Sequence, residues 1–340
     1  MSKMKTVGHP LSPLPSELPN ELRGPDWVQA NPQRIERELR SALALPSGGW
    51  YVLDSSRSIG EKPRRFWVEG HELVTWRAGR ELRVAPNACP HMGASLAEAP
   101  VRDGRIVCPW HGLELGAERH GAWCPLVAHD DGVLCWVRLD GQGGERAGEE
   151  PATSSPIVSP RPTMFIDSVM TMEADCEPRD VIANRLDPWH GVYYHPHTFK
   201  RLKVIGVEAG RLLVRVVYGM TDRLGIEVDA TFHCPDPRTI TMTIIAGEGA
   251  GSVVETHATP LRAGRSAIVE ATMATSDRPG FQRAIRAAGL IRPFILKSQR
   301  KLWVEDAEYA ERRYALRTGQ VPAAGRALSA PASEGSEQGH

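Results

Sequence analysis

Residues 88–96 read Ala-Cys-Pro-His-Met-Gly-Ala-Ser-Leu, and residues 108–112 read Cys-Pro-Trp-His-Gly. Each stretch supplies one thiol and one imidazole, and sixteen residues lie between the two pairs. The four side chains are Cys89, His91, Cys108 and His111. A proline stiffens the backbone after each cysteine, and Gly93 and Gly112, which follow the two histidines by two residues and one residue, allow tight turns. The spacing therefore predicts two loops that present four metal ligands to one site.

Two thiolates and two imidazoles form the ligand set of a [2Fe–2S] cluster in which cysteines hold one iron and histidines hold the other. Histidine ligation raises the reduction potential to roughly −150 to +300 mV. The alternative is a structural zinc site, which usually pairs its ligands as Cys-x2-Cys or His-x3–5-His. A Cys-x-His motif with a matching Cys-x2-His motif fits that pattern poorly, so the spacing favours the cluster.

Short β-type runs surround these loops from Trp50 to about Leu139, and Gly, Asp and Pro turns separate them. This texture predicts a small all-β domain. The stretch from Gly49 to Val137 resembles the Rieske [2Fe–2S] domain, in which the four side chains above are the cluster ligands. Two positions depart from the pattern that is frequent in Rieske oxygenases, because Met92 replaces an arginine and Leu113 replaces a tryptophan.

The composition excludes several classes of protein. Lys plus Arg equals Asp plus Glu at 41 each, so the charge indicates no nucleic-acid partner. No apolar stretch approaches the roughly 20 residues of a transmembrane helix, and no secretory signal opens the chain, so we expect a cytoplasmic protein. The six cysteines are therefore expected as free or metal-bound thiols. Two of them, Cys124 and Cys135, are predicted to be buried in the core.

The chain of 340 residues has room for about two domains. A helix is predicted over Trp27–Leu45 from its apolar spacing, and a Pro-, Ser- and Gly-rich stretch predicts a linker. We expect an N-terminal arm and helix over residues 1–45, the Rieske domain over 46–140, a linker over 141–162, a catalytic domain over 163–318 and a disordered tail over 319–340.

The second domain is predicted from alternating apolar residues in long runs between Lys203 and Ala274, which indicate five or six antiparallel strands with one buried, apolar face. Helices are expected over Asp180–Trp189 and over residues 279–317. The fold class is therefore α+β: an N-terminal all-β Rieske domain followed by a catalytic domain of antiparallel sheet plus helices, resembling a helix grip.

A second group of polar side chains begins this domain. It consists of Asn184, Asp187, His190 and His195. The first three are spaced by three residues and are expected to share one side of a helix. His195 lies roughly 140° round an ideal helix from His190, so the helix must end or bulge between them to bring both to one metal. Two histidines with one carboxylate leave open positions on a ferrous ion.

This spacing resembles the iron motif of Rieske-type non-haem iron oxygenases, of the dicamba monooxygenase and chlorophyllide oxygenase kind. The resemblance implies a mononuclear Fe(II) on His190, His195 and an acid from a late helix. Residues 301–311 resemble the closing Glu-Asp segment of that family, which makes Asp306 the expected ligand and Glu305 the runner-up. His197 is expected to lie beside the site or at the surface, and His233 and His257 are expected to be structural.

The resemblance also implies how electrons travel. The acid corresponding to Asp187 bridges a cluster histidine of one subunit and an iron-ligand histidine of the next, which implies a homotrimer. The chain has no glycine-rich nucleotide motif, so a separate ferredoxin or NAD(P)H-dependent reductase is expected as electron donor. The expected activity is oxidation by O2 of a hydrophobic ring compound, with monooxygenation favoured over dioxygenation. Hydroxylation, dealkylation, desaturation and cyclisation all fit, and the alternative is a Rieske electron carrier or ligand-binding protein without oxygenase activity.

Overall fold

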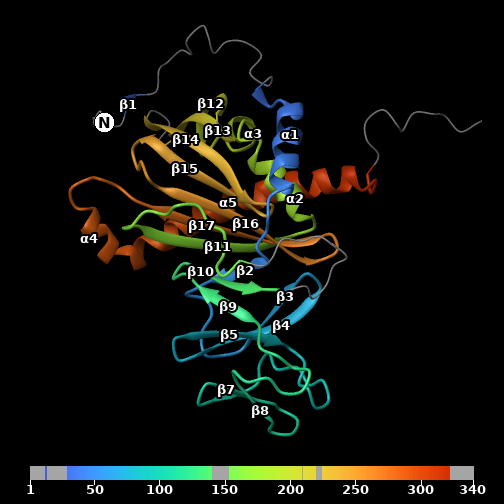
Figure 1. Cartoon of the computed structure of the whole chain (residues 1–340). Coiled ribbons are helices and arrows are strands. Elements are labelled where there is room, and N and C mark those ends of the chain that lie inside the picture. Colours follow the sequence, from blue (N-terminus) through green and yellow to red (C-terminus); the bar gives the residue numbers. More distant parts are fainter. Residues whose placement is uncertain (1–11, 14–28, 140–152, 209, 220–223, 322–340) are drawn as a thin grey trace, which may run out of the picture.

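The computed structural model describes residues 12–13, 29–139, 153–208, 210–219 and 224–321. Three small antiparallel sheets form the N-terminal half, and an eight-stranded antiparallel sheet with helices forms the C-terminal half (Figure 1). The predicted α+β fold class is therefore confirmed. The predicted arm, apart from a short strand β1 (Ser12–Pro13), lies outside the described residues, as do residues 140–152 of the linker region and the tail beyond residue 321.

The N-terminal half is built from nine short strands. They are β2 (Trp50–Ser55), β3 (Arg64–Val68), β4 (His71–Ala78), β5 (Glu81–Pro86), β6 (Val101–Arg102), β7 (Arg105–Val107), β8 (Glu114–Leu115), β9 (Val127–Asp130) and β10 (Leu134–Arg138). They pair in the orders β2-β10-β9, β3-β4-β5 and β6-β7-β8. The two-residue turn Asp103-Gly104 joins β6 to β7 with positive φ at both residues, which suits a tight hairpin. Strands β6 and β8 have two residues each and β9 has four, too few for an alternating pattern to mark them in the sequence.

The C-terminal half is dominated by one sheet of long strands. These are β11 (Ile166–Ala174), β12 (Phe199–Glu208), β13 (Arg211–Gly219), β14 (Leu224–Asp236), β15 (Thr239–Gly247), β16 (Val253–Arg262) and β17 (Arg265–Ala274). Their order is β11-β17-β16-β15-β14-β13-β12, and β1 pairs with β14. The chain therefore runs as a meander from β12 to β17. Strand β11, which precedes them in the sequence, pairs with β17 and forms the edge of the sheet opposite β12. The predicted runs between Lys203 and Ala274 correspond to β12–β17, whereas β11 was missed.

Both faces of this sheet are covered near β16 and β17, which corrects the expectation of a single buried face. Val269 and Met273 of β17 pack against Trp50 and Trp136 of the N-terminal half. The neighbouring Ile268 points to the other face and packs in a cluster with side chains of the helices. Because successive residues of a strand alternate between faces, one strand serves both interfaces.

Five helices complete the described part of the chain. They are α1 (Pro32–Leu43), α2 (Pro178–Arg185), α3 (His190–Tyr194), α4 (Phe281–Arg286) and α5 (Ala288–Arg317). Asn31 caps α1 through its side chain, which accepts from the backbone N–H of Arg34, and Pro32 follows at the first helical position. The helix thus begins after the predicted Trp27, and residues 27 and 28 lie outside the described residues. No helix in the described ranges is long and apolar enough to span a bilayer.

A buried polar network joins the two halves of the chain. Arg161 donates to both carboxylate oxygens of Glu255 at 2.7 and 2.6 Å and also pairs with Asp131 at 2.9 Å. Glu255 accepts from His257 Nε2 at 3.2 Å, and the His257 ring lies edge-on to Trp136. Because Asp131 and Trp136 belong to the N-terminal half, this network fixes that half to the large sheet.

Candidate metal centres

The two loops with the thiol–imidazole pairs share one backbone pattern. The N–H of Cys89 donates to Ala94 O, and the N–H of Gly93 donates to Cys89 O, both at 2.8 Å. In the second loop Cys108 N and O make the same bonds, with Leu113 O at 2.8 Å and Gly112 N at 2.9 Å. Gly93 and Gly112 both have a φ near +75°, a value that only glycine adopts without strain. The two loops are therefore near copies of one another.

Their side chains divide into a buried and an exposed pair. Cys89 and Cys108 are 3% and 2% exposed, whereas His91 and His111 are exposed at the tip of the domain. The two imidazoles approach each other, with 3.2 Å between their Nδ1 atoms. An open recess of about 810 Å³ is lined by His91, His111, His120 and Trp123, among others. The arrangement fits a cluster whose thiolate-bound iron lies inside and whose imidazole-bound iron faces outward.

Backbone N–H groups lie at both sulfur atoms. Burial raises the pKa of Cys89, and hydrogen bonds from the backbone of His91 and Met92 oppose that rise. For Cys108 burial is outweighed by the same kind of bonds, from the backbone of Trp110 and His111, and its pKa is lowered. Donors that favour the thiolate are what a cysteine ligand of iron requires.

A break between two helices divides the second group of polar residues, and the first helix ends earlier than the predicted Trp189. Helix α2 ends at Arg185, and residues 186–189 form turns before α3 begins at His190. Pro188 explains the break, because a proline disfavours helical backbone at the residue before it. The prediction that Asn184 and His190 share one helix is therefore wrong. Helix α3 ends at Tyr194, so His195 follows at its C-cap, as the expected interruption before His195 requires.

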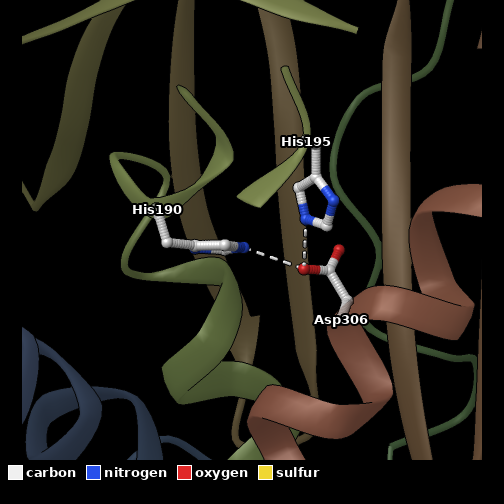
Figure 2. Close-up of side chains that lie close together, drawn as sticks. All are labelled: His190, His195 and Asp306. Carbon is white, nitrogen blue, oxygen red and sulfur yellow. Dashed lines mark hydrogen bonds and ion pairs between the residues drawn. The ribbon is translucent and has the colours of Figure 1, made fainter. Parts of the chain in front are cut away.

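Two histidines and one acid converge in the C-terminal half. The Nε2 atoms of His190 and His195 lie 2.8 and 2.9 Å from Oδ1 of Asp306, which comes from α5 (Figure 2). Donor atoms of the three residues all lie within 4.8 Å of one another. His195 is 1% and Asp306 3% exposed, whereas the His190 side chain is 15% exposed, so two of the three residues are shielded from bulk water. Two imidazole nitrogens and a carboxylate are a donor set suited to ferrous iron.

The opposite edge of each imidazole has its own acceptor. The Nδ1 atom of His190 contacts the backbone carbonyl of Asp187, and the Nδ1 atom of His195 lies 2.5 Å from Glu305 Oε2. With a proton on Nδ1 alone, each Nε2 lone pair would be available to a metal ion, whereas a ring that carries a proton on Nε2 donates it to Asp306. Glu305 is therefore not part of the triangle formed by His190, His195 and Asp306.

Electrostatics keep Asp306 ionised. Burial would raise its pKa, but hydrogen bonds from His190 and His195 lower it well below the usual range. The pKa of His195 is raised, because the effect of burial is outweighed by its bonds to Asp306 and Glu305. Asn184 donates its side-chain N–H to Asp306 Oδ1 at 3.0 Å, and its own Oδ1 is buried without a partner in the described ranges.

Asp187 lies next to this site and is itself buried. Tyr309 donates to its Oδ2 at 3.4 Å, and burial raises its pKa against the opposing charges of His190 and Arg34. Arg34 of α1 also donates to Leu186 O at 3.0 Å. Oδ1 of Asp187 has no hydrogen-bond partner among the described residues. One carboxylate oxygen of Asp187 is therefore buried and unpaired among the described residues.

The inner surface is more polar than the apolar wall predicted from the sequence. Glu270 of β17 is 5% exposed and accepts from Trp303 Nε1 at 2.7 Å, and burial raises its pKa. The guanidinium carbon of Arg185 lies 5.6 Å from the Phe232 ring and 5.8 Å from the Trp303 ring. Its Nε is buried without a hydrogen-bond partner in the described part of the chain. The sequence pattern predicted neither the buried Glu270 on β17 nor the approach of Arg185 from α2.

The remaining histidines and cysteines mostly lie where the sequence put them. His197 is partly exposed with Nε2 3.9 Å from Glu305, and His257 is buried in the interdomain network. His233 of β14 is partly buried, and burial lowers its pKa. All six cysteines are free, and Cys135 is buried as predicted. The prediction for Cys124 is wrong, because it is exposed and lies in a loop before Pro125.

Family models match both halves of the chain. The model described as "Rieske [2Fe-2S] domain" matches residues 49–129, and the model described as "Domain of unknown function (DUF5914)" matches residues 147–321. The N-terminal match identifies the two thiol–imidazole loops as part of a Rieske domain, which supports the predicted [2Fe–2S] cluster. The C-terminal match spans more than half of the 340 residues.

Curated relatives match over limited stretches. The chain is 41% identical over 76 residues to the vanillate O-demethylase oxygenase subunit of Pseudomonas sp. (strain HR199 / DSM 7063), which is 22% of this chain and 21% of that protein. It is 37% identical over 85 residues to an aminopyrrolnitrin oxygenase of Pseudomonas fluorescens, covering 24% and 23%. A chloroacetanilide N-alkylformylase oxygenase component of Rhizorhabdus wittichii (strain DC-6 / KACC 16600) matches at 26% over 161 residues, covering 43% and 45%. The chain thus spans less than half the length of these relatives.

Solved structures match over most of the chain. Dicamba monooxygenase bound to dicamba superposes with a TM-score of 0.58 at 18% identity, covering 82% of this chain and 91% of that one. The terminal oxygenase of carbazole 1,9a-dioxygenase from Novosphingobium sp. KA1 superposes with a TM-score of 0.51 at 13% identity, covering 86% and 89%. The resemblance to Rieske oxygenases is confirmed at the level of the fold. The chain belongs to the family described as "Domain of unknown function (DUF5914)", here preceded by a Rieske [2Fe–2S] domain.

Proposed function

We propose that this chain is the oxygenase component of a Rieske-type non-haem iron system, which oxidises a hydrophobic ring compound with O2. One observation carries the proposal: a Rieske loop pair and a buried triangle of two histidines and one aspartate occur in the same chain. An electron carrier needs only the first of these. The triangle has the donor set of a non-haem iron oxygenase site.

The four loop side chains would hold the cluster, with Cys89 and Cys108 on the inner iron and His91 and His111 on the outer iron. A bound [2Fe–2S] cluster accepts and releases single electrons. Exposure of both imidazoles at the tip of the domain supports electron entry and exit through that edge. The backbone N–H groups at the two sulfurs would stabilise the thiolate form and so tune the potential.

A ferrous ion held by His190, His195 and Asp306 would supply the centre at which O2 and substrate react. The acceptors at each Nδ1 would favour the tautomer protonated there, so that both Nε2 atoms could bind the metal. Insertion of one oxygen atom into the substrate takes up two electrons and two protons and releases the other oxygen atom as water. Asn184 would keep Asp306 oriented through their hydrogen bond.

Electrons would pass between subunits through Asp187. In one chain the Rieske loops beside β7 and β8 and the helix α3 lie at opposite ends of the molecule, which disfavours transfer within a subunit (Figure 1). We therefore propose a homotrimer in which Asp187 bridges to a cluster histidine of the partner subunit, with its Oδ1, buried in the single chain, uncovered in the assembly. The carbonyl of Asp187 already contacts His190, so the path to the iron site is short.

The donor would be a separate ferredoxin or NAD(P)H-dependent reductase, and the protein would act in the cytoplasm. The relatives named above are an O-demethylase of vanillate, an aminopyrrolnitrin oxygenase and a chloroacetanilide N-alkylformylase. These names support a ring-containing small molecule as the substrate class, with monooxygenation favoured. Hydroxylation and dealkylation are the outcomes closest to those names.

Iron content with matched variants tests the proposal. Anaerobically purified protein should contain about three irons per chain, two in the cluster and one in the mononuclear site. His190→Ala should leave about two irons and an unchanged Rieske resonance on reduction, whereas Cys108→Ser should lose the resonance and keep about one ferrous ion. Wild-type protein should consume O2 with a generic reductase and a panel of ring compounds, and both variants should not. Two irons per chain in the wild type, unaffected by His190→Ala, would identify an electron carrier.

A further inference from the structure

The segment that carries α4 and the first half of α5 is strongly basic. Residues 278–304 contain seven Lys or Arg and no Asp or Glu, in a chain whose net charge is zero. Arg278 pairs with Glu248 at 2.7 Å and Arg292 pairs with Asp167 at 2.7 Å. The other five cations are exposed and form no ion pair among the described residues: Arg283, Arg286, Lys297, Arg300 and Lys301.

Two large apolar side chains stand among these cations. Leu290 and Phe294 of α5 are each 76% exposed, which exceeds every other large hydrophobic side chain in the described ranges. They are four residues apart, so they share one side of the helix. Residues 299 and 303, which are buried against the sheet, lie roughly 140–180° away around the helix axis. The apolar pair therefore points directly away from the protein core.

We propose that α4 and the first half of α5 dock on an anionic lipid surface. Lys297 and Lys301 follow Leu290 and Phe294 by seven residues each and so share their side of α5, while Arg283 and Arg286 lie on the neighbouring α4. Cations beside outward apolar side chains are typical of segments that lie in a membrane interface. Each cation near an anionic surface contributes about a fivefold gain in partitioning. Leu290 and Phe294 would enter the boundary between headgroups and acyl chains, while the five cations remain among the headgroups.

Other occupants of this surface fit less well. An electron donor must reach the cluster, but Figure 1 shows α4 at the edge of the large sheet, far from the Rieske loops beside β7 and β8. Two copies that meet through this same surface would place five unpaired cations against five more, which repel each other, and the contact of the proposed trimer lies instead at Asp187 and the Rieske loops. A lipid surface supplies both an apolar layer and negative charge, so it satisfies the two features together.

Vesicle co-sedimentation of the iron-loaded protein tests the docking surface. The wild type should bind vesicles of equal parts phosphatidylglycerol and phosphatidylcholine, bind pure phosphatidylcholine vesicles at least tenfold more weakly, and be released in about 1 M NaCl. Arg283→Gln with Arg286→Gln should lower the partition coefficient roughly 25-fold, at about fivefold per charge. Leu290→Ser with Phe294→Ser should lower it at least tenfold.

Matched controls come from exposed residues elsewhere. Arg80→Gln with Arg102→Gln removes two exposed charges from the Rieske domain, and Met164→Ser removes a side chain that is 51% exposed. Both should bind the vesicles as the wild type does. Equal loss in the control and patch variants, or no binding by the wild type, overturns the proposal. Light scattering measures the mass of the protein particle in solution. If the Arg283/Arg286 and Leu290/Phe294 variants change this mass and leave vesicle binding unchanged, the surface contacts a second copy and the proposal is wrong. None of these measurements depends on oxygenase activity.

Discussion

Glu305 Oε2 lies 2.5 Å from Nδ1 of His195, while Oδ1 of the next residue, Asp306, lies 2.9 Å from Nε2 of the same ring. Two consecutive acids of α5 thus meet opposite edges of one imidazole. Because a histidine binds a metal through one nitrogen and is oriented through the other, this geometry separates the roles of the two acids. Asp306 faces the convergent site, and Glu305 supports the ring from behind.

Glu305→Gln is expected to weaken ferrous binding without abolishing it. The variant loses the charged acceptor at His195 Nδ1, and loss of such a supporting partner typically costs about 10–100-fold in metal affinity. Asp306→Ala removes a donor of the triangle and should reduce the iron content to that of the cluster alone. Anaerobic Fe(II) titration of protein with an intact cluster measures both. An equally complete loss in Glu305→Gln would make Glu305 the ligand.

Asp187→Asn should separate iron binding from electron transfer. The carboxyl group is not part of the metal triangle, so the variant should keep about three irons per chain and an unchanged Rieske resonance. Reoxidation of the chemically reduced cluster by O2 should be at least tenfold slower, because the bridging acceptor is weakened. Tyr309→Phe, which removes only the 3.4 Å bond to Asp187, serves as the control and should cost less. Wild-type reoxidation in Asp187→Asn contradicts the proposed path.

Gly191→Ala should disturb the iron site through packing alone. A Cβ at this buried position would lie 2.9 Å from Cδ2 of Phe199, so α3 or the ring has to move. Overpacking of this kind costs about 1–3 kcal/mol and should shift the neighbouring His190. Fe(II) affinity and urea unfolding both report on the change. The double variant Gly191→Ala with Phe199→Leu should recover much of both, and failure to recover would point to a cause other than this contact.

Glu255→Gln should alter how stability depends on pH. Burial would raise the pKa of Glu255, but its hydrogen bonds with Arg161 and His257 lower it below the usual 4.5. Because the unfolded state then binds the proton more tightly, this group contributes stability that is present at neutral pH and lost as pH falls from about 4.5 towards the folded pKa.

The variant should therefore lose less stability on acidification than the wild type, and at pH 7 it should be less stable by about 3 kcal/mol, because Arg161 loses a buried partner. Urea unfolding at pH 7 and in steps below pH 5 measures both. Glu173→Gln breaks an ion pair with Arg265 whose glutamate side chain is 51% exposed, and it should cost under about 1 kcal/mol. Parallel pH profiles for wild type and Glu255→Gln would show that the network does not titrate as described.

The parts of the structure that depend on local spacing could be predicted from the sequence. The Rieske loops are short, so Cys89 and His91 are brought together by their own turn. The strands β12–β17 follow from period-two alternation. Asp306 was expected only through resemblance, since 111 residues separate it from His195 and no local pattern joins them. Its metal-ligand role stays a prediction.

Features that depend on tertiary contacts were missed. The break at Pro188 was overlooked because regular spacing of Asn184, Asp187 and His190 suggested one helix. Strand β11 escaped because its partner β17 lies about a hundred residues later, and pairing across such a distance leaves no mark in the local sequence. Cys124 was assigned to the core from its residue type, whereas its loop beside Pro125 leaves it exposed. Glu270 is buried on the sheet, and its carboxylate is satisfied by hydrogen bonds from Trp303, Gln299 and Thr256, which are distant in sequence.

The separation of the Rieske loops and α3 within one chain has a consequence for mixtures of defective subunits (Figure 1). If each iron site draws its electrons from a neighbour, then a Cys108→Ser subunit and a His190→Ala subunit carry complementary halves of a working pair. Chains that are inactive alone should regain turnover after co-expression, in proportion to the junctions where an intact cluster meets an intact iron site.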